Sequence, residues 1–194
     1  MISHRHKFIF IHLIKCGGTT IENILGGVKS HRPGGHFIFK EDWVETTKNK
    51  VHVCASQYSK TFYWDGYFKF TFVRNPWDKM VSFYEYYRKL RNEPNIKFID
   101  FLLDEHWKPM FYDQLTHLVS HNGKNEIDFI GKFENLQEDF NTICDKIKIP
   151  RHQLPHKNAT NHKHYTEYYD DETKQIVAEK YAKDIEYFGY KFGE

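Results

Sequence analysis

The segment Lys15-Cys16-Gly17-Gly18-Thr19-Thr20 has the residue types that bind a phosphate or sulfate group. It follows a β-branched and aromatic run that predicts a buried strand at residues 7–14, and it leads into a predicted helix at residues 19–25. Glycines allow a ligand to approach the backbone, amides of a first helical turn attract anions, and Lys15 adds positive charge. We therefore predict an anion site formed by Lys15, Cys16, Gly17, Gly18, Thr19 and Thr20. Thr19 and Glu22 also fit a capping box for this helix.

A second predicted strand, at residues 68–73, also ends in a pattern that suits an anion. Arg74 follows the strand, Asn75 suits a helix N-cap, and Pro76 suits the first helical position. Ser82 lies two turns into that helix. We predict that Arg74 and Ser82 hold a second phosphate. In the alternative, Arg74 pairs with a carboxylate and Ser82 only fills space.

The Lys15 segment differs from the phosphate loop of nucleotide triphosphatases. In that loop the lysine follows the glycines and is itself followed by a Ser or Thr that holds magnesium. Here Lys15 precedes the glycines and is followed by Cys16, so the magnesium ligand is missing. The 13 His residues include no zinc-binding spacing either, and we predict no metal site.

Predicted strands and helices alternate along the chain, which favours an α/β fold with a mostly parallel sheet covered on both faces. No internal repeat or linker divides the 194 residues, so we expect one domain over 1–194. The strands are predicted at 7–14, 51–55, 68–73 and 127–133, the helices at 19–25, 76–91, 96–106, 110–120, 136–147 and 171–187, and a loop at 28–50.

The composition excludes several classes of protein. With 28 Lys and Arg against 26 Asp and Glu, the formal charge is +2, which argues against a general nucleic-acid binder. The longest apolar run has seven residues, 8–14, whereas a bilayer span needs roughly 18–20. Cys16, Cys54 and Cys144 are odd in number and not closely spaced, as expected in a reducing compartment. We expect a soluble, cytoplasmic protein.

The two anion-binding patterns resemble motifs of the sulfotransferases, specifically the carbohydrate (family 2) group. Phe10-Ile-His-Leu-Ile-Lys-Cys-Gly-Gly-Thr-Thr-Ile-Glu22 is similar to the 5′-phosphosulfate-binding motif of that group. Phe72-Val-Arg-Asn-Pro-Trp-Asp-Lys-Met-Val-Ser-Phe-Tyr84 resembles its 3′-phosphate-binding motif, and residues 130–136 and 154–190 fit its downstream pattern. The chain departs from the group at Ile14, Cys16 and Lys79, where Pro, Thr and Arg are more usual.

This resemblance implies a P-loop-like three-layer domain with a central, mostly parallel sheet flanked by helices. It implies transfer of a sulfuryl group from 3′-phosphoadenosine 5′-phosphosulfate (PAPS) to a hydroxyl or amine of a carbohydrate-like acceptor. Lys15 would neutralise charge on the bridging oxygen, and no metal would take part. The alternatives are a catalytically inactive nucleotide-binding module of the same fold and a P-loop kinase.

The general base has two candidates. Members of the group often carry a His about twenty residues before the Val-Arg-Asn-Pro motif, and His52 fits that spacing. His36 is the competitor, and for each residue the alternative is an ordinary polar His. Lys157, His162 and Lys163 are basic residues that could close over donor or acceptor, and the sequence does not choose among them. It identifies neither the acceptor nor the oligomeric state.

Overall fold

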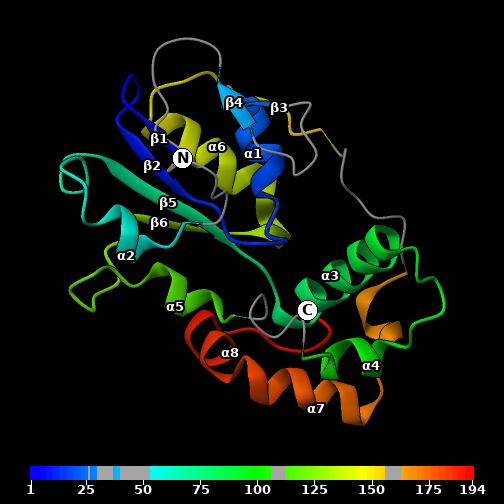
Figure 1. The fold of residues 1–194 in the computed structure, drawn as a ribbon. Helices are drawn as coiled ribbons and strands as arrows, with labels where there is room; N and C mark the ends of the chain where they lie inside the picture. The colour runs from blue at the N-terminus through cyan, green and yellow to red at the C-terminus, as the bar shows by residue number, and fades with distance from the viewer. Residues whose placement is uncertain (26, 30–36, 40–52, 106–111, 156–162) are drawn as a thin grey trace. The chain divides into compact units, whose positions relative to one another are not determined.

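The structure is a computed structural model that describes residues 1–25, 27–29, 37–39, 53–105, 112–155 and 163–194. Its contacts divide the chain into two compact units (Figure 1). Unit 1 comprises Met1–Val73 and His117–Asn158, and unit 2 comprises Arg74–Thr116 and Ala159–Glu194. A division by contacts does not test whether the chain is a single domain, so one domain over 1–194 stays a prediction.

Unit 1 contains a four-stranded, mostly parallel sheet in the order β1-β2-β5-β6. Its strands are β1 (Ile2–Ser3), β2 (Phe8–Ile11), β5 (Phe68–Val73) and β6 (Phe129–Lys132). β1 is antiparallel to β2, whereas β2, β5 and β6 run parallel, with Phe8 opposite Phe68 and Phe70 opposite Phe129. Every residue of β2 is buried, and Phe10 stacks on Phe70 with ring centroids 5.0 Å apart. The α/β class and the mostly parallel sheet are therefore confirmed.

The helices of unit 1 include α1 (Gly18–Ile24), α2 (Ala55–Tyr58) and α6 (Leu136–Lys146). Figure 1 shows α1 and α6 on the same side of the sheet, and α6 buries Phe140, Ile143 and Cys144. A second sheet pairs β3 (Gly27–Lys29) with the antiparallel β4 (Phe37–Phe39). These strands correct the prediction of a loop throughout residues 28–50.

In its described residues, unit 2 consists of helices and connecting segments. They are α3 (Pro76–Arg91), α4 (Phe98–Leu103), the first residues of α5 (Gln114–Leu118), α7 (Asp171–Lys180) and α8 (Ala182–Phe188). The start of α3 is as predicted, with Pro76 in its first turn and the Asn75 side chain accepting a hydrogen bond from the Trp77 amide at 3.1 Å. Aromatic rings fill the core beside α3, and the ring centroids of Tyr84 and Phe98 lie 5.1 Å apart.

Two predicted elements differ from the structure. The strand predicted at 51–55 is wrong in its described part, because Val53 and Cys54 lie outside any strand and Ala55 begins α2. A short apolar run does not separate strand from helix, and here Ala55 and Tyr58 are buried at the three-residue spacing of a helix.

The helix predicted at 171–187 is divided at Tyr181, whose backbone angles (φ −111°, ψ 25°) leave the helical region. The Tyr181 ring centroid lies 5.0 Å from Nζ of Lys79, and its hydroxyl donates to the Met80 sulfur at 3.2 Å. Packing on α3 thus interrupts a helix that the local pattern predicts as continuous.

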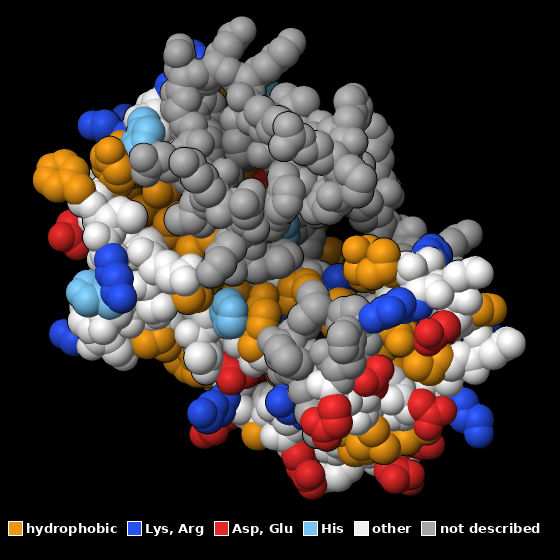
Figure 2. Space-filling model, viewed as in Figure 1, with side chains coloured by type: hydrophobic (Ala, Val, Ile, Leu, Met, Phe, Trp, Pro, Cys, Tyr) orange, Lys and Arg blue, Asp and Glu red, His pale blue; other side chains and the backbone are white. Residues whose placement is uncertain are grey.

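The surface matches the balanced composition. On the face drawn in Figure 2, Lys and Arg side chains are interspersed with Asp and Glu rather than gathered into one basic area. None of the helices in the described part of the chain is both long and apolar enough to cross a membrane.

Candidate functional site

The turn between β2 and α1 contains two residues in the left-handed backbone region. Lys15 has φ +63°, and Gly17, the N-cap of α1, has φ +78°. A residue with a side chain seldom adopts this conformation, so the turn holds Lys15 in an unusual backbone geometry. The Lys15 side chain is half-buried.

The backbone amides around this turn fall into two sets. The amides of Thr20 and Ile21 both donate to the Gly17 carbonyl, at 3.0 and 3.4 Å. By contrast, the amides of Gly17, Gly18 and Thr19 donate to no carbonyl among the described residues. Helix starts leave such donors for side chains, water or ligands, and here no side chain caps α1.

The capping box predicted from Thr19 and Glu22 is wrong. The helix begins at Gly18, two residues before the start that such a box requires, and the Glu22 carboxylate lies beside His12 instead. Its Oε1 lies 3.1 Å from Nδ1 of His12, with both side chains buried. The His12 ring in turn lies against Gly18, so closely that a β-carbon at position 18 would overlap it.

The second predicted anion site lies at the start of α3 in unit 2. Arg74 directly follows β5 and is buried, and its Nε donates to Oδ2 of Asp78 at 2.7 Å. Arg74 therefore does pair with a carboxylate, one helical turn away, and this ion pair orients the guanidinium. Ser82 is buried on α3, and its hydroxyl makes no hydrogen bond to another described residue.

Comparison with known proteins supplies the family. A model of the sulfotransferase family matches residues 1–191, nearly the whole chain. The chain belongs to the sulfotransferase family. An uncharacterized protein of Archaeoglobus fulgidus is 40% identical over 88 residues, which make up 44% of this chain and 72% of that protein. No solved structure gives a significant match.

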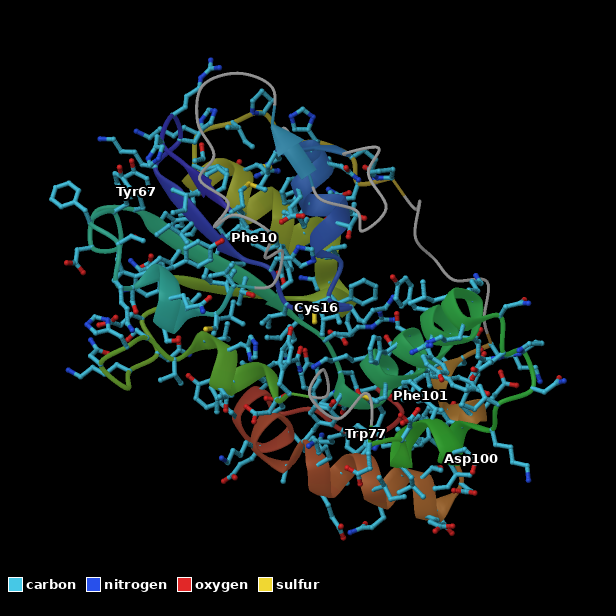
Figure 3. The ribbon with its side chains drawn as sticks, viewed as in Figure 1. Phe10, Cys16, Tyr67, Trp77, Asp100 and Phe101 are labelled. Atoms are coloured by element: carbon cyan, nitrogen blue, oxygen red, sulfur yellow. The ribbon has the colours of Figure 1, made fainter. Side chains whose placement is uncertain are left out.

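In this sulfotransferase, Cys16 differs from its neighbours in the turn. Its thiol is buried and donates to the Ile14 carbonyl at 3.3 Å, and Figure 3 labels Cys16 in the turn between β2 and α1. Cys16 can therefore offer a ligand its backbone but not its side chain. Thr20 is also buried, whereas Thr19 is half-exposed.

Lys79 lies in an aromatic environment in unit 2. Its Nζ donates to the Tyr112 carbonyl at 3.1 Å and lies 5.1 and 5.0 Å from the ring centroids of Tyr112 and Tyr181. A compact ammonium suits this position between rings, whereas the planar guanidinium of the more usual Arg has a different shape.

Both candidate bases, His52 and His36, lie outside the described residues, as do Lys157 and His162. Lys163 is described, and its Nζ lies 3.4 Å from the Glu167 carboxylate at the surface of unit 2. Among the described residues, no three His, Cys, Asp or Glu side chains gather as a metal site would need. Metal independence stays a prediction.

Sequence reasoning missed two buried polar residues of unit 2, Gln114 and Asp184. Neither lies in a motif, and each is separated from Arg74 by many residues in the chain. A polar residue with no exposed surface needs hydrogen-bond partners, so the burial of these two is the signal that marks them.

Proposed function

We propose that this sulfotransferase moves a sulfuryl group from PAPS to a hydroxyl or amine of a carbohydrate-like acceptor. Family membership supports sulfuryl transfer in general. The observation that carries the choice of donor is the turn of Lys15, Gly17 and Gly18. It combines a lysine with three amides that bond no carbonyl of the described chain, as a phosphosulfate requires.

The Lys15 turn would hold the 5′-phosphosulfate end of the donor. When bound, the donor supplies an activated sulfuryl group for in-line displacement. The amides of Gly17, Gly18 and Thr19 would bind the oxygens of the 5′-phosphate. Lys15 would neutralise the charge that develops on the bridging oxygen, which is a stabilisation of the kind that fixed donors provide in other transferases.

Arg74 and Ser82 would hold the 3′-phosphate. The Asp78 carboxylate engages Nε of Arg74, and a guanidinium carries four further N–H groups besides that one. The Ser82 hydroxyl can donate to a phosphate oxygen. Arg suits this task because its planar donors match the oxygens of a phosphate.

The fold that we propose around this site is the P-loop-like three-layer domain, extending over residues 1–194. The parallel strands β2, β5 and β6 support it, as does the position of the Lys15 turn at the carboxyl end of β2.

For the acceptor side, we propose that either His52 or His36 takes the proton of the attacking group, since a neutral imidazole is suited to this near pH 7. The variants His52→Ala and His36→Ala separate them. The variant that lacks the base loses transfer but still binds adenosine 3′,5′-bisphosphate, the desulfated product.

One experiment tests the proposed function directly. Turnover of radiolabelled PAPS is measured against a panel of glycans and simple alcohols and amines, and calorimetry measures binding of adenosine 3′,5′-bisphosphate. We expect binding together with transfer to at least one acceptor class. Binding without transfer would favour the inactive module, and no binding would contradict the proposed donor.

A further inference from the structure

The side chain of Gln114 holds the backbone of Arg74 on both of its polar groups. The Arg74 amide donates to Oε1 of Gln114 at 2.8 Å, and Nε2 of Gln114 donates to the Arg74 carbonyl at 2.9 Å. A neighbouring strand would make the same pair of bonds to a residue within a sheet. Arg74 lies one residue beyond the end of β5, so Gln114 replaces a strand partner there.

Asp184, on α8, determines which way the Gln114 amide points. Its Oδ2 accepts from the backbone amide of Gln114 at 2.7 Å and from Nε2 of Gln114 at 3.1 Å, and its Oδ1 accepts from the Leu115 amide at 2.9 Å. A carboxylate facing Nε2 excludes the flipped amide, because Oε1 would then meet another acceptor. Gln114 is thus fixed with its oxygen toward the Arg74 amide.

Gln114 and Asp184 are buried with no exposed surface, so neither side chain can touch a ligand. Burial raises the pKa of Asp184, and the hydrogen bonds from Gln114 and Leu115 together with the charge of Lys79 oppose that rise. The pair acts through Arg74, which is held at both ends. Gln114 bonds its backbone, and Asp78 bonds its guanidinium at Nε.

We infer that Gln114, held by Asp184, is a positioning residue that sets where the Arg74 guanidinium meets the 3′-phosphate of the nucleotide. This inference rests on the proposed function. It extends the 3′-phosphate site to two buried residues from α5 and α8. Its specific consequence is that discrimination between adenosine 3′,5′-bisphosphate and adenosine 5′-monophosphate depends on Gln114, which contacts neither.

Calorimetry with these two nucleotides tests the inference on four proteins: the wild type, Arg74→Ala, Gln114→Met and the double variant. Methionine keeps the volume of Gln114 and removes its hydrogen bonds. We expect Gln114→Met to weaken binding of the bisphosphate about tenfold and to leave binding of the monophosphate unchanged. The double variant should bind the bisphosphate as Arg74→Ala does, because both changes act on one interaction.

Gln137 provides a matched control in unit 1. Its side chain also clamps backbone, accepting from the Leu154 amide at 2.8 Å and donating to the His152 carbonyl at 3.1 Å. Gln137→Met removes comparable bonds, and we expect it to leave the ratio of the two nucleotide affinities unchanged. Circular dichroism and thermal unfolding check that each variant is folded.

The outcomes separate the inference from the proposed function. The relevant quantity is the affinity for the bisphosphate divided by the affinity for the monophosphate. If Arg74→Ala lowers this ratio but Gln114→Met leaves it unchanged, or weakens the binding of both nucleotides equally, the positioning role is wrong and the 3′-phosphate site stands. If Arg74→Ala leaves the ratio unchanged, the 3′-phosphate site and the positioning role are both wrong. Should Gln114→Met fail to fold, Asp184→Asn replaces it, because an amide has one acceptor oxygen in place of two and so loses its hydrogen bonds either from Gln114 or from Leu115, which weakens the hold on the Gln114 side chain. The same reduction of the ratio is expected.

Discussion

The imidazole ring of His12 lies directly against Gly18, and the contact leaves no space for a side chain at position 18. Gly18→Ala must therefore displace His12 from Glu22 or shift the turn that carries Lys15. We expect this variant to lose about 1–3 kcal/mol of unfolding free energy, as overpacked buried sites do. Calorimetry should also show weaker binding of adenosine 3′,5′-bisphosphate, and urea denaturation measures the stability.

Gly66→Ala is the matched control for that substitution. Gly66 also lies in unit 1, but a β-carbon there would meet nothing within 4 Å. We expect near-wild-type stability and nucleotide binding. Equal effects of the two substitutions would show that the tight contact with His12 has no role in binding.

Lys15→Ala should reduce kcat/KM for sulfuryl transfer by roughly 10²–10³-fold, because it removes a charge that stabilises the leaving group. The fold should persist, since the Lys15 side chain is half-buried rather than part of the core. Initial rates at varied PAPS measure the effect.

Lys7→Ala controls for the backbone cost of that change. Lys7 also has a left-handed backbone, with φ +50°, and its side chain is exposed in the same unit. The two alanine variants thus share their conformational change and differ in position. Near-normal turnover by Lys15→Ala at saturating PAPS would contradict the role of Lys15 in sulfuryl transfer.

Cys16→Ala should leave nucleotide affinity within about threefold of wild type, because the thiol is buried and donates to the Ile14 carbonyl, which leaves the backbone of Cys16 to meet a ligand. Calorimetry with adenosine 3′,5′-bisphosphate measures this. A large loss of affinity in a folded variant would instead give the thiol a direct part in binding.

Asp170, the N-cap of α7, should make the stability of the protein depend on pH. Hydrogen bonds from the Thr173 side chain and amide lower the pKa of Asp170 below its usual 3.8. A lowered pKa in the folded state contributes stability above pH 3.8, and this contribution is lost as the pH falls below that value. Thermal unfolding at pH 2–6 should show the loss in the wild type and a flatter profile in Asp170→Asn.

Asp171→Asn provides the control for this pH series, because Asp171 is the next residue but not the cap of α7. Its profile should follow that of the wild type. If the profile of Asp170→Asn coincides with those of the wild type and Asp171→Asn, the Asp170 carboxylate does not contribute to the loss of stability at low pH.

A chelator should leave sulfuryl transfer unchanged, because the proposed chemistry assigns charge neutralisation to Lys15 and to backbone amides. Rates with and without EDTA, after dialysis against the chelator, measure this. A strict requirement for added magnesium would contradict the proposed mechanism and revive the kinase alternative.

The sequence predicts the central elements of the fold accurately where periodicity and flanking residues agree. Residues 68–73 form β5 with the predicted bounds, and Asn75 and Pro76 begin α3 as their cap chemistry indicates. Prediction fails where distant packing decides. Tyr181 ends α7 because of its contacts with α3. Ala55 joins a helix that the short run at 51–55, with four apolar residues, does not distinguish from a strand.

The candidate site shows the same limit. Lys15 and Arg74 could be predicted because each directly follows a strand in an informative motif. The buried residues around them could not be predicted, because their contacts form only in the folded chain. His12 lies beside Glu22 of α1, Gln114 bonds the backbone of Arg74, and Asp184 bonds Gln114. Sequence identifies the groups that would face the donor, and burial identifies those that position them.

The pairing of the central sheet also has a consequence for how the chain folds. Phe8 of β2 pairs with Phe68 of β5, and Phe70 of β5 pairs with Phe129 of β6. Each parallel pair therefore brings together residues far apart in the sequence, and the entropy cost of closing that loop comes before the strand contacts form. Parallel sheets of such high contact order form slowly. The turn that carries Lys15 extends from β2, so we expect donor-binding competence to arise late in refolding, together with the pairing of β5 rather than with the formation of the helices.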